Sequence, residues 1–296
     1  MANPKLSIVV AVKDGADNLP ALLSVLSEDD HMEIIVTCAG PVPAVAAELG
    51  TSFPAETLVP TLWSEGIKLA KSRKVALTTA QFVPDNRWLS RLHAADLDGW
   101  AGIGGAIDND TRSSARNWAI FFLRYSAFAP PLHAGETQEI AADNAVYDRL
   151  EILKHPDLLK EGFWEPSFHR RFQADGRKLS LDPEMIVVHQ GTVSAESFAQ
   201  QRYLHGRAYG IERAERGSVM RNLLLLASSP LVPPLLLARI VSRIARKPAY
   251  RSKLVTSFPW LVRFTLAWAR GEAGGYASTL GGRLSGKPAH GLKRHA

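Results

Sequence analysis

The first half of the chain alternates short apolar runs with segments whose apolar residues recur at helical spacing. Alternation of strands with helices of roughly ten residues predicts an α/β fold whose sheet is mostly parallel and flanked by helices. Ligands in such sheets bind beyond the carboxyl ends of the strands. We expect strands at Leu6–Val12, Glu33–Thr37, Val75–Thr78 and Trp100–Ile107, and helices at Leu19–Leu26, Pro43–Leu49, Ser64–Ala70, Arg87–Ala95 and Ala115–Tyr125.

The pattern changes after His189. Ser194–Arg216 predicts a long helix with four arginines, and Leu223–Val241 is strongly apolar but contains three prolines and Arg239. A membrane-spanning helix needs about 20 apolar residues, and the prolines interrupt this run. We interpret Leu223–Val241 as a broken pair of helices in the membrane interface, and Ser257–Ala269 as a second interfacial segment with two tryptophans. A single span, or ordinary packing on the first half of the chain, remains as an alternative.

The amino-acid composition limits the possible class and domain organisation of the protein. The 296 residues are 46% hydrophobic, which is enough for one large α/β domain and an appendage. The single cysteine, Cys38, excludes an internal disulfide and a cysteine-based zinc site, and fits a reducing compartment. The apolar run at the N-terminus is too brief for a secretion signal. We expect a catalytic-type domain at 1–217, a membrane-associating helical segment at 218–275 and a basic disordered tail at 276–296.

The net charge of +6 is concentrated toward the C-terminus, where eleven Lys or Arg follow Val241 and Glu272 is the only acidic residue. Apolar residues interleave with these cations, and no nucleic-acid-binding motif is visible. We therefore expect an anionic membrane surface as partner and no nucleic acid. A basic membrane-surface or nucleic-acid adaptor explains the tail but not the first two hundred residues.

The segment Glu161–Gly176 carries the most specific chemistry. Glu165 follows Phe163 and Trp164 and opens a helix that ends on a basic pair and a glycine. This resembles the acceptor-side segment of membrane-associated family 2 glycosyltransferases of the GT-A fold, where a carboxylate opens a helix of the form (E/D)xxLxxRLxxxG. Further segments resemble the same family in order and spacing: Leu6–Leu23, Pro84–Trp88, Gly104–Gly105, Asp143–Tyr147 and Gln200–Arg207.

The resemblance implies a GT-A-type fold and an inverting glycosyltransferase that moves a sugar from a nucleotide or lipid-phosphate donor to a hydroxyl. It implies Glu165 as the catalytic base, with Asp143, Asn144 and Trp164 on the acceptor side. The apolar C-terminal segments indicate a lipid-linked or polyprenyl-linked acceptor, and a peripheral or monotopic protein at the cytoplasmic face of the membrane.

Two signature sites of the family are altered. The DxD aspartates that hold Mg²⁺ or Mn²⁺ are replaced by Thr79 and Gln81, and Cys38 stands near the aspartate that binds uridine. A hard divalent cation prefers charged oxygens, so we expect no metal at this position and no other cofactor. Positive charge is then required from elsewhere. We assign donor or diphosphate binding to Thr79, Gln81, His189, Arg202 and Arg207; Arg170 is a further candidate and Arg171 a support residue.

Each assignment has a structural alternative. Glu165 also suits a helix N-terminus, Asn144 a helix cap, and His189 a polar strand end. The literal DxD at Asp108–Asp110 is expected to be a solvated turn, and Trp63 and Trp88 are expected to be packing residues. The altered signatures leave a second hypothesis open, a non-catalytic binding or scaffold protein of the same fold at the membrane.

Overall fold

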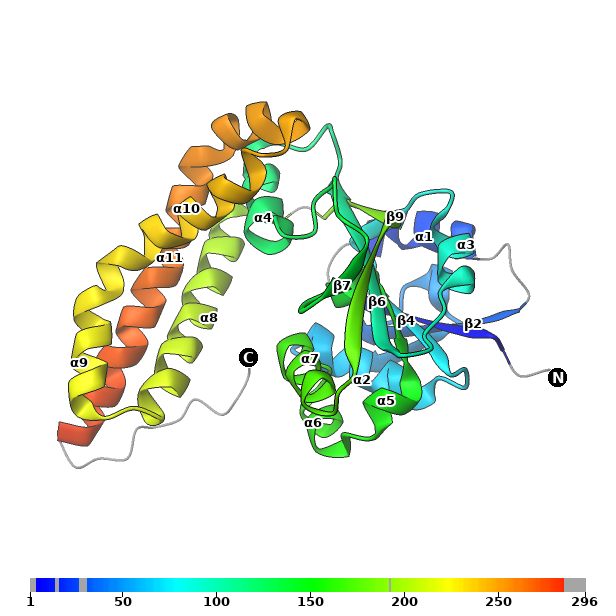
Figure 1. Cartoon of the computed structure of the whole chain (residues 1–296), viewed down its shortest axis with the longest axis horizontal. Coiled ribbons are helices and arrows are strands. Elements are labelled where there is room, and N and C mark those ends of the chain that lie inside the picture. Colours follow the sequence, from blue (N-terminus) through cyan, green and yellow to red (C-terminus); the bar gives the residue numbers. More distant parts are fainter. Residues whose placement is uncertain (1–3, 14–15, 27–30, 192, 285–296) are drawn as a thin grey trace. The chain divides into compact units, whose positions relative to one another are not determined.

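The computed structural model describes residues 4–13, 16–26, 31–191 and 193–284, and it divides into two compact units (Figure 1). The first unit contains Met1–Arg112 and Ala127–Gly191, and the second contains Ser113–Ser126 and Thr192–Ala296. The expected boundary at residue 217 therefore differs from the observed division. The chain enters the second unit at Ser113, returns, and enters it again after Gly191.

One mixed sheet forms the centre of the first unit. Its strand order is β3-β2-β1-β4-β8-β6-β9-β5, with β7 paired to β9. The pairs β1–β2, β1–β4, β2–β3 and β6–β9 are parallel, while β8 runs antiparallel between β4 and β6. The strands are β1 Leu6–Val12, β2 Met32–Ala39, β3 Gly50–Phe53, β4 Lys74–Thr79, β5 Phe82–Pro84, β6 Trp100–Asn109, β7 Gly135–Thr137, β8 Ala145–Asp148 and β9 Lys178–His189.

Helices flank this sheet, as the alternating pattern predicts. Most of the expected elements are present, and α1 has the expected bounds. The helices of this unit are α1 Leu19–Leu26, α2 Val59–Leu69, α3 Trp88–Ala94, α5 Arg149–Leu153, α6 Pro156–Glu161 and α7 Glu165–Ala174, with short 3₁₀ turns η1 Ala16–Asn18, η2 Ala44–Ala46 and η3 Ala142–Asn144.

The helix expected at Pro43–Leu49 is wrong. Only the 3₁₀ turn η2 forms there, and the strand β3 follows directly. Ala46 is the one buried residue of η2, so this segment presents no apolar face to pack. Helices of this length depend on tertiary packing, which explains why the helical propensity of the alanines does not decide the structure.

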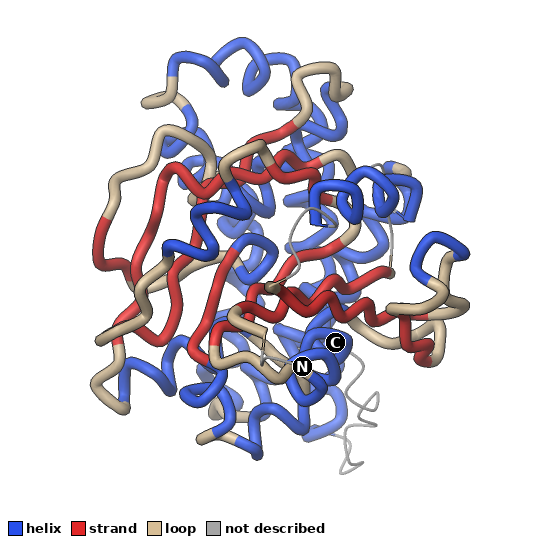
Figure 2. The backbone as a smooth tube through the Cα atoms, turned by 90° about the vertical axis from the view of Figure 1, so that its right-hand side faces the viewer, coloured by secondary structure: helices blue, strands red, loops and turns tan. Residues whose placement is uncertain are grey.

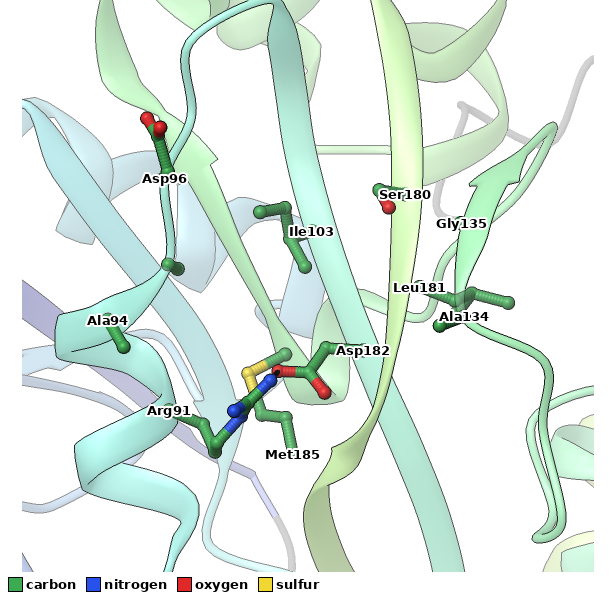
Figure 3. Close-up of a pocket in the computed structure, with 11 residues that line it drawn as sticks. Arg91, Ala94, Asp96, Ile103, Ala134, Gly135, Ser180, Leu181, Asp182 and Met185 are labelled. Atoms are coloured by element: carbon green, nitrogen blue, oxygen red, sulfur yellow. Dashed lines mark hydrogen bonds and ion pairs between the residues drawn. The ribbon is translucent and has the colours of Figure 1, made fainter.

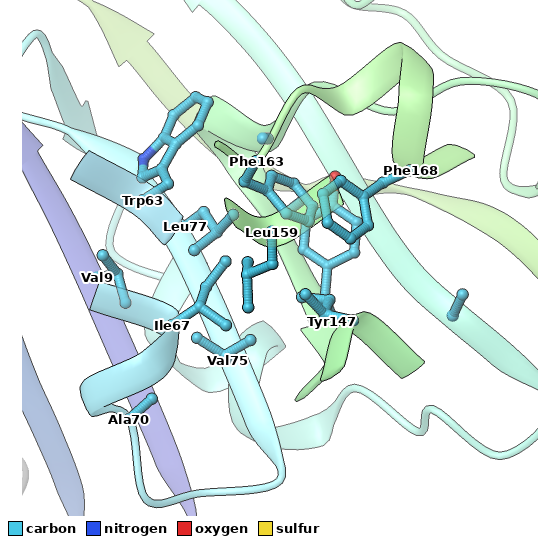
Figure 4. Close-up of a cluster of buried hydrophobic side chains, with 14 of the residues drawn as sticks. Val9, Trp63, Ile67, Ala70, Val75, Leu77, Tyr147, Leu159, Phe163 and Phe168 are labelled. Carbon is cyan, nitrogen blue, oxygen red and sulfur yellow. The ribbon is translucent and has the colours of Figure 1, made fainter. Parts of the chain in front are cut away.

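The hydrophobic core lies between the sheet and the helices α2, α6 and α7. Val9, Leu77 and Tyr147 contribute from the strands and pack against Ile67 of α2 and Phe168 of α7 (Figure 4). The ring of Phe163 stacks on Phe168 at 4.5 Å between centroids and meets Tyr147 edge-on at 5.0 Å. This aromatic cluster fixes the N-terminal end of α7, where Glu165 lies.

The second unit is helical. Its long helices α8 and α11 pack along each other, and α4, α9 and α10 pack against α11 (Figure 1). Its elements are α4 Ala115–Tyr125, α8 Ala195–Glu215, α9 Val219–Ser228, η4 Ser229–Leu231, α10 Val232–Ile244, η5 Pro248–Tyr250 and α11 Arg251–Leu284. Helix α11 continues through Pro259 and reaches Leu284, so the expected disordered tail is helical over 276–284, and 285–296 lies outside the described residues.

Glycines allow α8 and α11 to approach closely. A Cβ atom on Gly206 of α8 would collide with the carbonyl oxygen of Trp268, and one on Gly271 of α11 would collide with that of Tyr203. Gly210 and Gly275 make equivalent contacts one helical turn further along. Two small residues spaced four apart on each helix bring the backbones together, a packing mode common among helices in membranes.

The apolar segment Val219–Ile244 forms two helices, α9 and α10, joined by η4 (Figure 1). Figure 2 shows the helices of the chain in blue and its strands in red. The division of this segment confirms the expected break of the apolar run into two helices. The segment is long and apolar enough by length and composition to cross a membrane, and only 17% of its most apolar stretch is buried. Leu224 and Leu235 are 65% and 66% exposed, whereas the polar side chain of Asn222 is fully buried. The apolar side chains therefore face outward along much of both helices.

Candidate functional site

Polar residues gather at one edge of the sheet in the first unit. The strands β1, β4, β6 and β9 all end there: β1 is parallel to β4, β6 is parallel to β9, and β8 is antiparallel to both β4 and β6, so these four strands run in one direction. At this edge Asn109 lies opposite His189, and the backbone amide of Asp110 donates to the carbonyl of His189 at 3.1 Å. The site expected beyond the carboxyl ends of the strands is therefore built from residues that are far apart in sequence.

Thr79, Gln81 and His189 meet at this edge. The backbone amide of Gln81 lies 3.4 Å from Thr79 Oγ1, and the amide of Gln190 donates to the carbonyl of Gln81 at 2.8 Å. A Cβ atom on Gly191 would lie 2.9 Å from His189 Nε2 and 3.2 Å from Gln81 Oε1, so these two side chains flank the glycine. The three residues assigned to the donor in this unit form one buried cluster.

Asn109 belongs to the same cluster but was not among the assigned site residues. Its Oδ1 lies 3.2 Å from His189 Nδ1, while its buried Nδ2 has no hydrogen-bond partner among the described residues. A buried amide donor without a partner is unusual and costs free energy unless a ligand or water satisfies it. The sequence offered one signal for this residue, its place inside Asp108–Asp110 at the end of a strand.

Asp143 and Glu165 lie at the same edge. Leu77 of β4 is opposite Ala145 of the antiparallel strand β8, so the residues that precede Ala145 lie beside the carboxyl end of β4. Those residues form η3, and the backbone amide of Ala142 donates a hydrogen bond to Glu165 Oε1. The carboxyl group of Glu165 therefore turns inward to η3 and not toward bulk solvent.

Burial and a neighbouring carboxylate disfavour the charged form of Glu165. The residue is partly exposed, yet protein surrounds its carboxyl group; desolvation, followed by the charge of Asp143, raises its pKa from 4.5 to about 8. The hydrogen bond from Ala142 opposes this shift, and Glu139 adds to it. A carboxyl group with such a pKa is a stronger proton acceptor than an ordinary glutamate once it has lost its proton.

Two buried polar side chains lie beneath Glu165. The hydroxyl of Tyr147 is 3.1 Å from His169 Nε2, and burial lowers the pKa of His169 to about 4. Burial, with the charges of Glu165 and Asp143, raises the pKa of the Tyr147 hydroxyl well above 10. Both groups are therefore neutral near pH 7, and they add no positive charge that would stabilise the carboxylate of Glu165.

Asn144 has a structural position. Its side chain is fully buried, accepts from Trp88 Nε1 at 2.7 Å, and donates to the carbonyl oxygens of Ala106 and Met185 at 2.8 Å each. Both amide hydrogens are used and no atom reaches the surface. The expected contact between Asn144 and an acceptor therefore has no exposed atom to make it, and the residue joins η3 to β6, β9 and α3.

The aromatic pair before Glu165 divides into two environments. Phe163 is fully buried in the core and is unavailable for stacking on a sugar. Trp164 is partly exposed, and its Nε1 donates to the carbonyl of Glu161 at 3.1 Å. Trp63 and Trp88 are buried packing residues, as expected, and Arg171 forms an ion pair with Asp157 at 3.4 Å that fits a support role.

The residues at the end of β4 do not fit a divalent cation. Thr79 and Gln81 offer a hydroxyl and an amide, and neither carries the charge that Mg²⁺ or Mn²⁺ prefers. The nearby carboxylate of Asp110 is engaged by Arg112 at 2.9 Å, and this ion pair lowers the pKa of Asp110. Within the described ranges, no group of three or more His, Cys, Asp or Glu residues is arranged to hold a metal ion.

Arg202 and Arg207 lie on α8 in the second unit. The guanidinium of Arg202 stacks over Trp268 at 4.2 Å, and its buried Nε lacks a hydrogen-bond partner among the described residues. Burial and the charge of Arg124 lower the pKa of Arg202 to about 10. Burial, followed by the charges of Arg202 and Arg124, lowers the pKa of His205. Arg124, on α4, is a basic neighbour that the sequence did not indicate, because α4 is far from α8 along the chain.

A separate hollow of about 320 Å³ lies beside β6 and β9 in the first unit (Figure 3). Arg91 of α3 forms an ion pair of 2.6 Å with Asp182, and both residues line the hollow. Their opposite charges therefore neutralise each other. None of the residues assigned to catalysis, donor or acceptor lines this hollow.

Comparison with known proteins supports the fold. No protein-family model matches the chain, and no curated protein matches its sequence. Among solved structures that resemble it is a mannosyltransferase from Pyrobaculum calidifontis, solved in complex with GDP-Man and Mn²⁺. The two chains share 13% sequence identity over 92% of this chain and 88% of the other, with a TM-score of 0.52. The chain therefore has a glycosyltransferase-like fold.

Proposed function

We propose that this protein is an inverting glycosyltransferase that moves a sugar from an activated donor to an acceptor hydroxyl without a divalent cation. One observation carries the proposal: the carboxyl group of Glu165 lies at the carboxyl-end edge of the sheet with its pKa raised to about 8. Perturbed acids in such positions are candidates for general bases. The glycosyltransferase-like fold gives this carboxyl group a reaction in which a base is required.

The proposed step follows from the position of Glu165. Its deprotonated carboxylate accepts the proton of the acceptor hydroxyl while the hydroxyl oxygen forms a bond to the anomeric carbon. The bond between that carbon and the donor phosphate oxygen breaks at the same time, and the phosphate leaves with the electron pair. Asp143 keeps a second negative charge beside the base, which favours the positively charged sugar of the transition state.

The donor lies in this proposal against Thr79, Gln81 and His189. These side chains are neutral hydrogen-bonding groups, and the departing phosphate carries several negative charges. Without a metal ion, positively charged side chains are therefore needed to balance that charge. Arg202 and Arg207, on α8 of the second unit, are separately proposed to bind an anionic group. The buried guanidinium of Arg202 has no carboxylate partner among the described residues, as expected for a group that receives an anionic ligand.

The acceptor is proposed to be lipid-linked, and the protein to sit on the cytoplasmic face of a membrane. The helices α9 and α10 support this: large apolar side chains such as Leu224, Leu231 and Leu235 are more than half exposed. Arg221 near one end and Arg243 near the other flank this apolar surface. Apolar helices with basic ends suit the interface of an anionic membrane.

A second candidate function is a non-catalytic protein that binds a sugar, a lipid or a partner enzyme. The observation that favours it is the absence of carboxylates at Thr79 and Gln81, where a metal-dependent transferase needs them. Titration calorimetry with a panel of sugar nucleotides, beginning with GDP-mannose, separates the two candidates. Donor binding without added metal supports transfer, and binding of none with or without Mn²⁺ supports the non-catalytic role.

Turnover of Glu165→Gln tests the catalytic proposal. General bases contribute roughly 10²–10⁴-fold to rate, so we expect kcat to fall by at least about 100-fold while donor affinity is retained. Glu161→Gln is the matched control, because Glu161 is an exposed glutamate four residues earlier, at the end of α6. Equal turnover of Glu165→Gln and the parent protein would refute the assignment of Glu165.

A further inference from the structure

A basic hollow of about 240 Å³ lies in the second unit where α8 ends and α9 begins. It is lined by Tyr209, Glu212, Arg213, Arg216 and Arg221. Three guanidinium groups therefore face one carboxylate. None of these residues is among those assigned to the sugar donor or the acceptor.

The three arginines differ in how they are held. Arg213 Nη1 lies 3.4 Å from the hydroxyl of Tyr276 and 3.8 Å from the buried carboxylate of Glu272, so these two residues of α11 hold its guanidinium group in place. Arg216 forms an ion pair of 2.8 Å with Glu212, and its side chain is 74% exposed. Arg221 is exposed and has no ion pair within the described part of the chain. The hollow thus contains a fixed cation and a cation without a carboxylate partner.

The backbone around the hollow adds to its positive character. Ser218 caps α9, and its Oγ accepts from the amide of Arg221 at 3.3 Å, so the positive end of the helix dipole lies beside the arginine. At the end of α8, Arg283 donates to the carbonyl oxygens of Gly217 and Glu215 at 2.7 and 2.9 Å. The negative end of α8 is therefore already neutralised.

Apolar side chains continue directly from this hollow along α9. Met220 and Leu224 are 69% and 65% exposed, and Leu224 lies one helical turn beyond Arg221 on the same face. Asn222 points inward instead, where its Nδ2 donates to the carbonyl of Ala214 at 2.9 Å. A basic hollow that opens beside an exposed apolar helix matches a molecule with an anionic head and a hydrocarbon chain.

We propose that this hollow binds the phosphate group of a membrane lipid, whose chains lie along the apolar face of α9. Arginine presents a planar pair of donors that matches two phosphate oxygens, and the exposed Arg216 and Arg221 can both turn toward one phosphate anchored over Arg213. The inference rests on the membrane association in the proposed function and adds to it a defined headgroup site.

The test compares two kinds of phosphatidylcholine vesicle with equal surface potential. One kind contains phosphatidylglycerol, and the other contains oleate, whose charge is a carboxylate. We expect flotation to show tighter binding of the parent protein to the phosphatidylglycerol vesicles. Arg221→Gln and Arg216→Gln are expected to lose most of this preference, and Arg221→Lys to lose part of it because the charge remains without the planar fork.

Controls separate the headgroup site from general attraction to a charged surface. Lys160→Gln removes an exposed cation in the first unit and is expected to keep the preference. If the arginines contributed only a general attraction to the charged membrane surface, the loss of one cation would weaken binding to both kinds of vesicle equally, by about fivefold. An equal preference in Arg221→Gln and the parent protein, with both folded by circular dichroism, would overturn the proposal.

Leu224→Asp tests the membrane association itself, since it places a charge on the apolar face without touching the arginines. We expect it to abolish binding to both vesicles. Loss of the preference in Arg221→Gln together with undiminished binding of Leu224→Asp would refute docking through α9, not phosphate recognition. Inorganic phosphate, with ionic strength matched by chloride, is expected to compete only weakly. If it binds Arg221 tightly and vesicles do not displace it, the hollow is a free-phosphate site and the lipid assignment is wrong.

Discussion

Glu165 makes the stability of this protein depend on pH in a direction opposite to that of an ordinary salt-bridged acid. Its pKa is 4.5 as a free side chain and about 8 in the folded chain. Between these two values the folded state holds a proton that the unfolded state releases. The contribution of this proton to stability is therefore complete below pH 4.5 and is lost as the pH rises through about 8.

The size of the effect follows from the shift. A change from 4.5 to about 8 spans roughly 3.5 pH units, which corresponds to about 5 kcal/mol at ~1.4 kcal/mol per unit. The residue is partly exposed, and solvent screening reduces this value, so we expect on the order of 2–3 kcal/mol. Glu165→Gln keeps the shape of the neutral acid and cannot lose a proton, so it lacks this part of the pH dependence.

Urea denaturation of the parent protein and Glu165→Gln at pH 5.5 and pH 9 measures the difference. The interval from pH 5.5 to about 8 covers roughly 2.5 of the 3.5 units, so we expect the parent to lose about 1.5–2 kcal/mol relative to the variant. Other titrating groups cancel between the two proteins. Glu161→Gln is expected to follow the parent. Parallel stability curves for the parent and Glu165→Gln would show that the carboxyl group is ordinary, and the structural basis for a base at this position would be refuted.

Three further predictions follow from the same structure. Burial lowers the pKa of His169 from 6.5 to about 4, so between these values the unfolded state binds a proton that the folded state does not. The free energy of unfolding of the parent therefore decreases as the pH falls below 6.5. In urea titrations, His169→Gln is expected to lose less stability than the parent between pH 7 and pH 5. Gly206→Ala inserts a methyl group against the backbone of Trp268 and is expected to destabilise the second unit by about 2–3 kcal/mol. Gly281→Ala is the control on helix α11, because a Cβ atom there would have no other atom within 4 Å. We expect its melting temperature to equal or exceed that of the parent. Transfer activity is expected to persist in excess EDTA, and strict dependence on Mn²⁺ would contradict the replacement of carboxylates by Thr79 and Gln81.

The strands and helices of the first unit were predictable where the apolar pattern and the packing agree. Leu6–Val12 and Leu19–Leu26 have the expected bounds, since every residue of the strand is buried and the helix buries one face. The pattern could not predict β8. Its four residues are all buried, and a short buried run does not distinguish a strand from a helical turn without knowledge of its neighbours β4 and β6.

The candidate functional site was likewise predictable only in part. The sequence placed Glu165 at the start of a helix, and the expectation that strand ends meet at one edge brought Thr79, Gln81 and His189 together. It could not predict that Glu165 would bind the amide of Ala142, because that contact depends on an antiparallel strand inserted between two parallel ones. The buried environment of Asn144 was missed for the same reason.

Helix α4 has a consequence for how this gene can be divided. It belongs to the second unit although both its flanking segments belong to the first, and its Trp118 and Phe122 rings meet Tyr250 at 5.8 and 6.3 Å. A recombinant fragment that stops after Gly191 would strip these aromatic rings of their partner and leave them open to aggregation. Neither half of the reading frame is a self-sufficient module, so expression trials and fusion joints belong outside the span from α4 to α11.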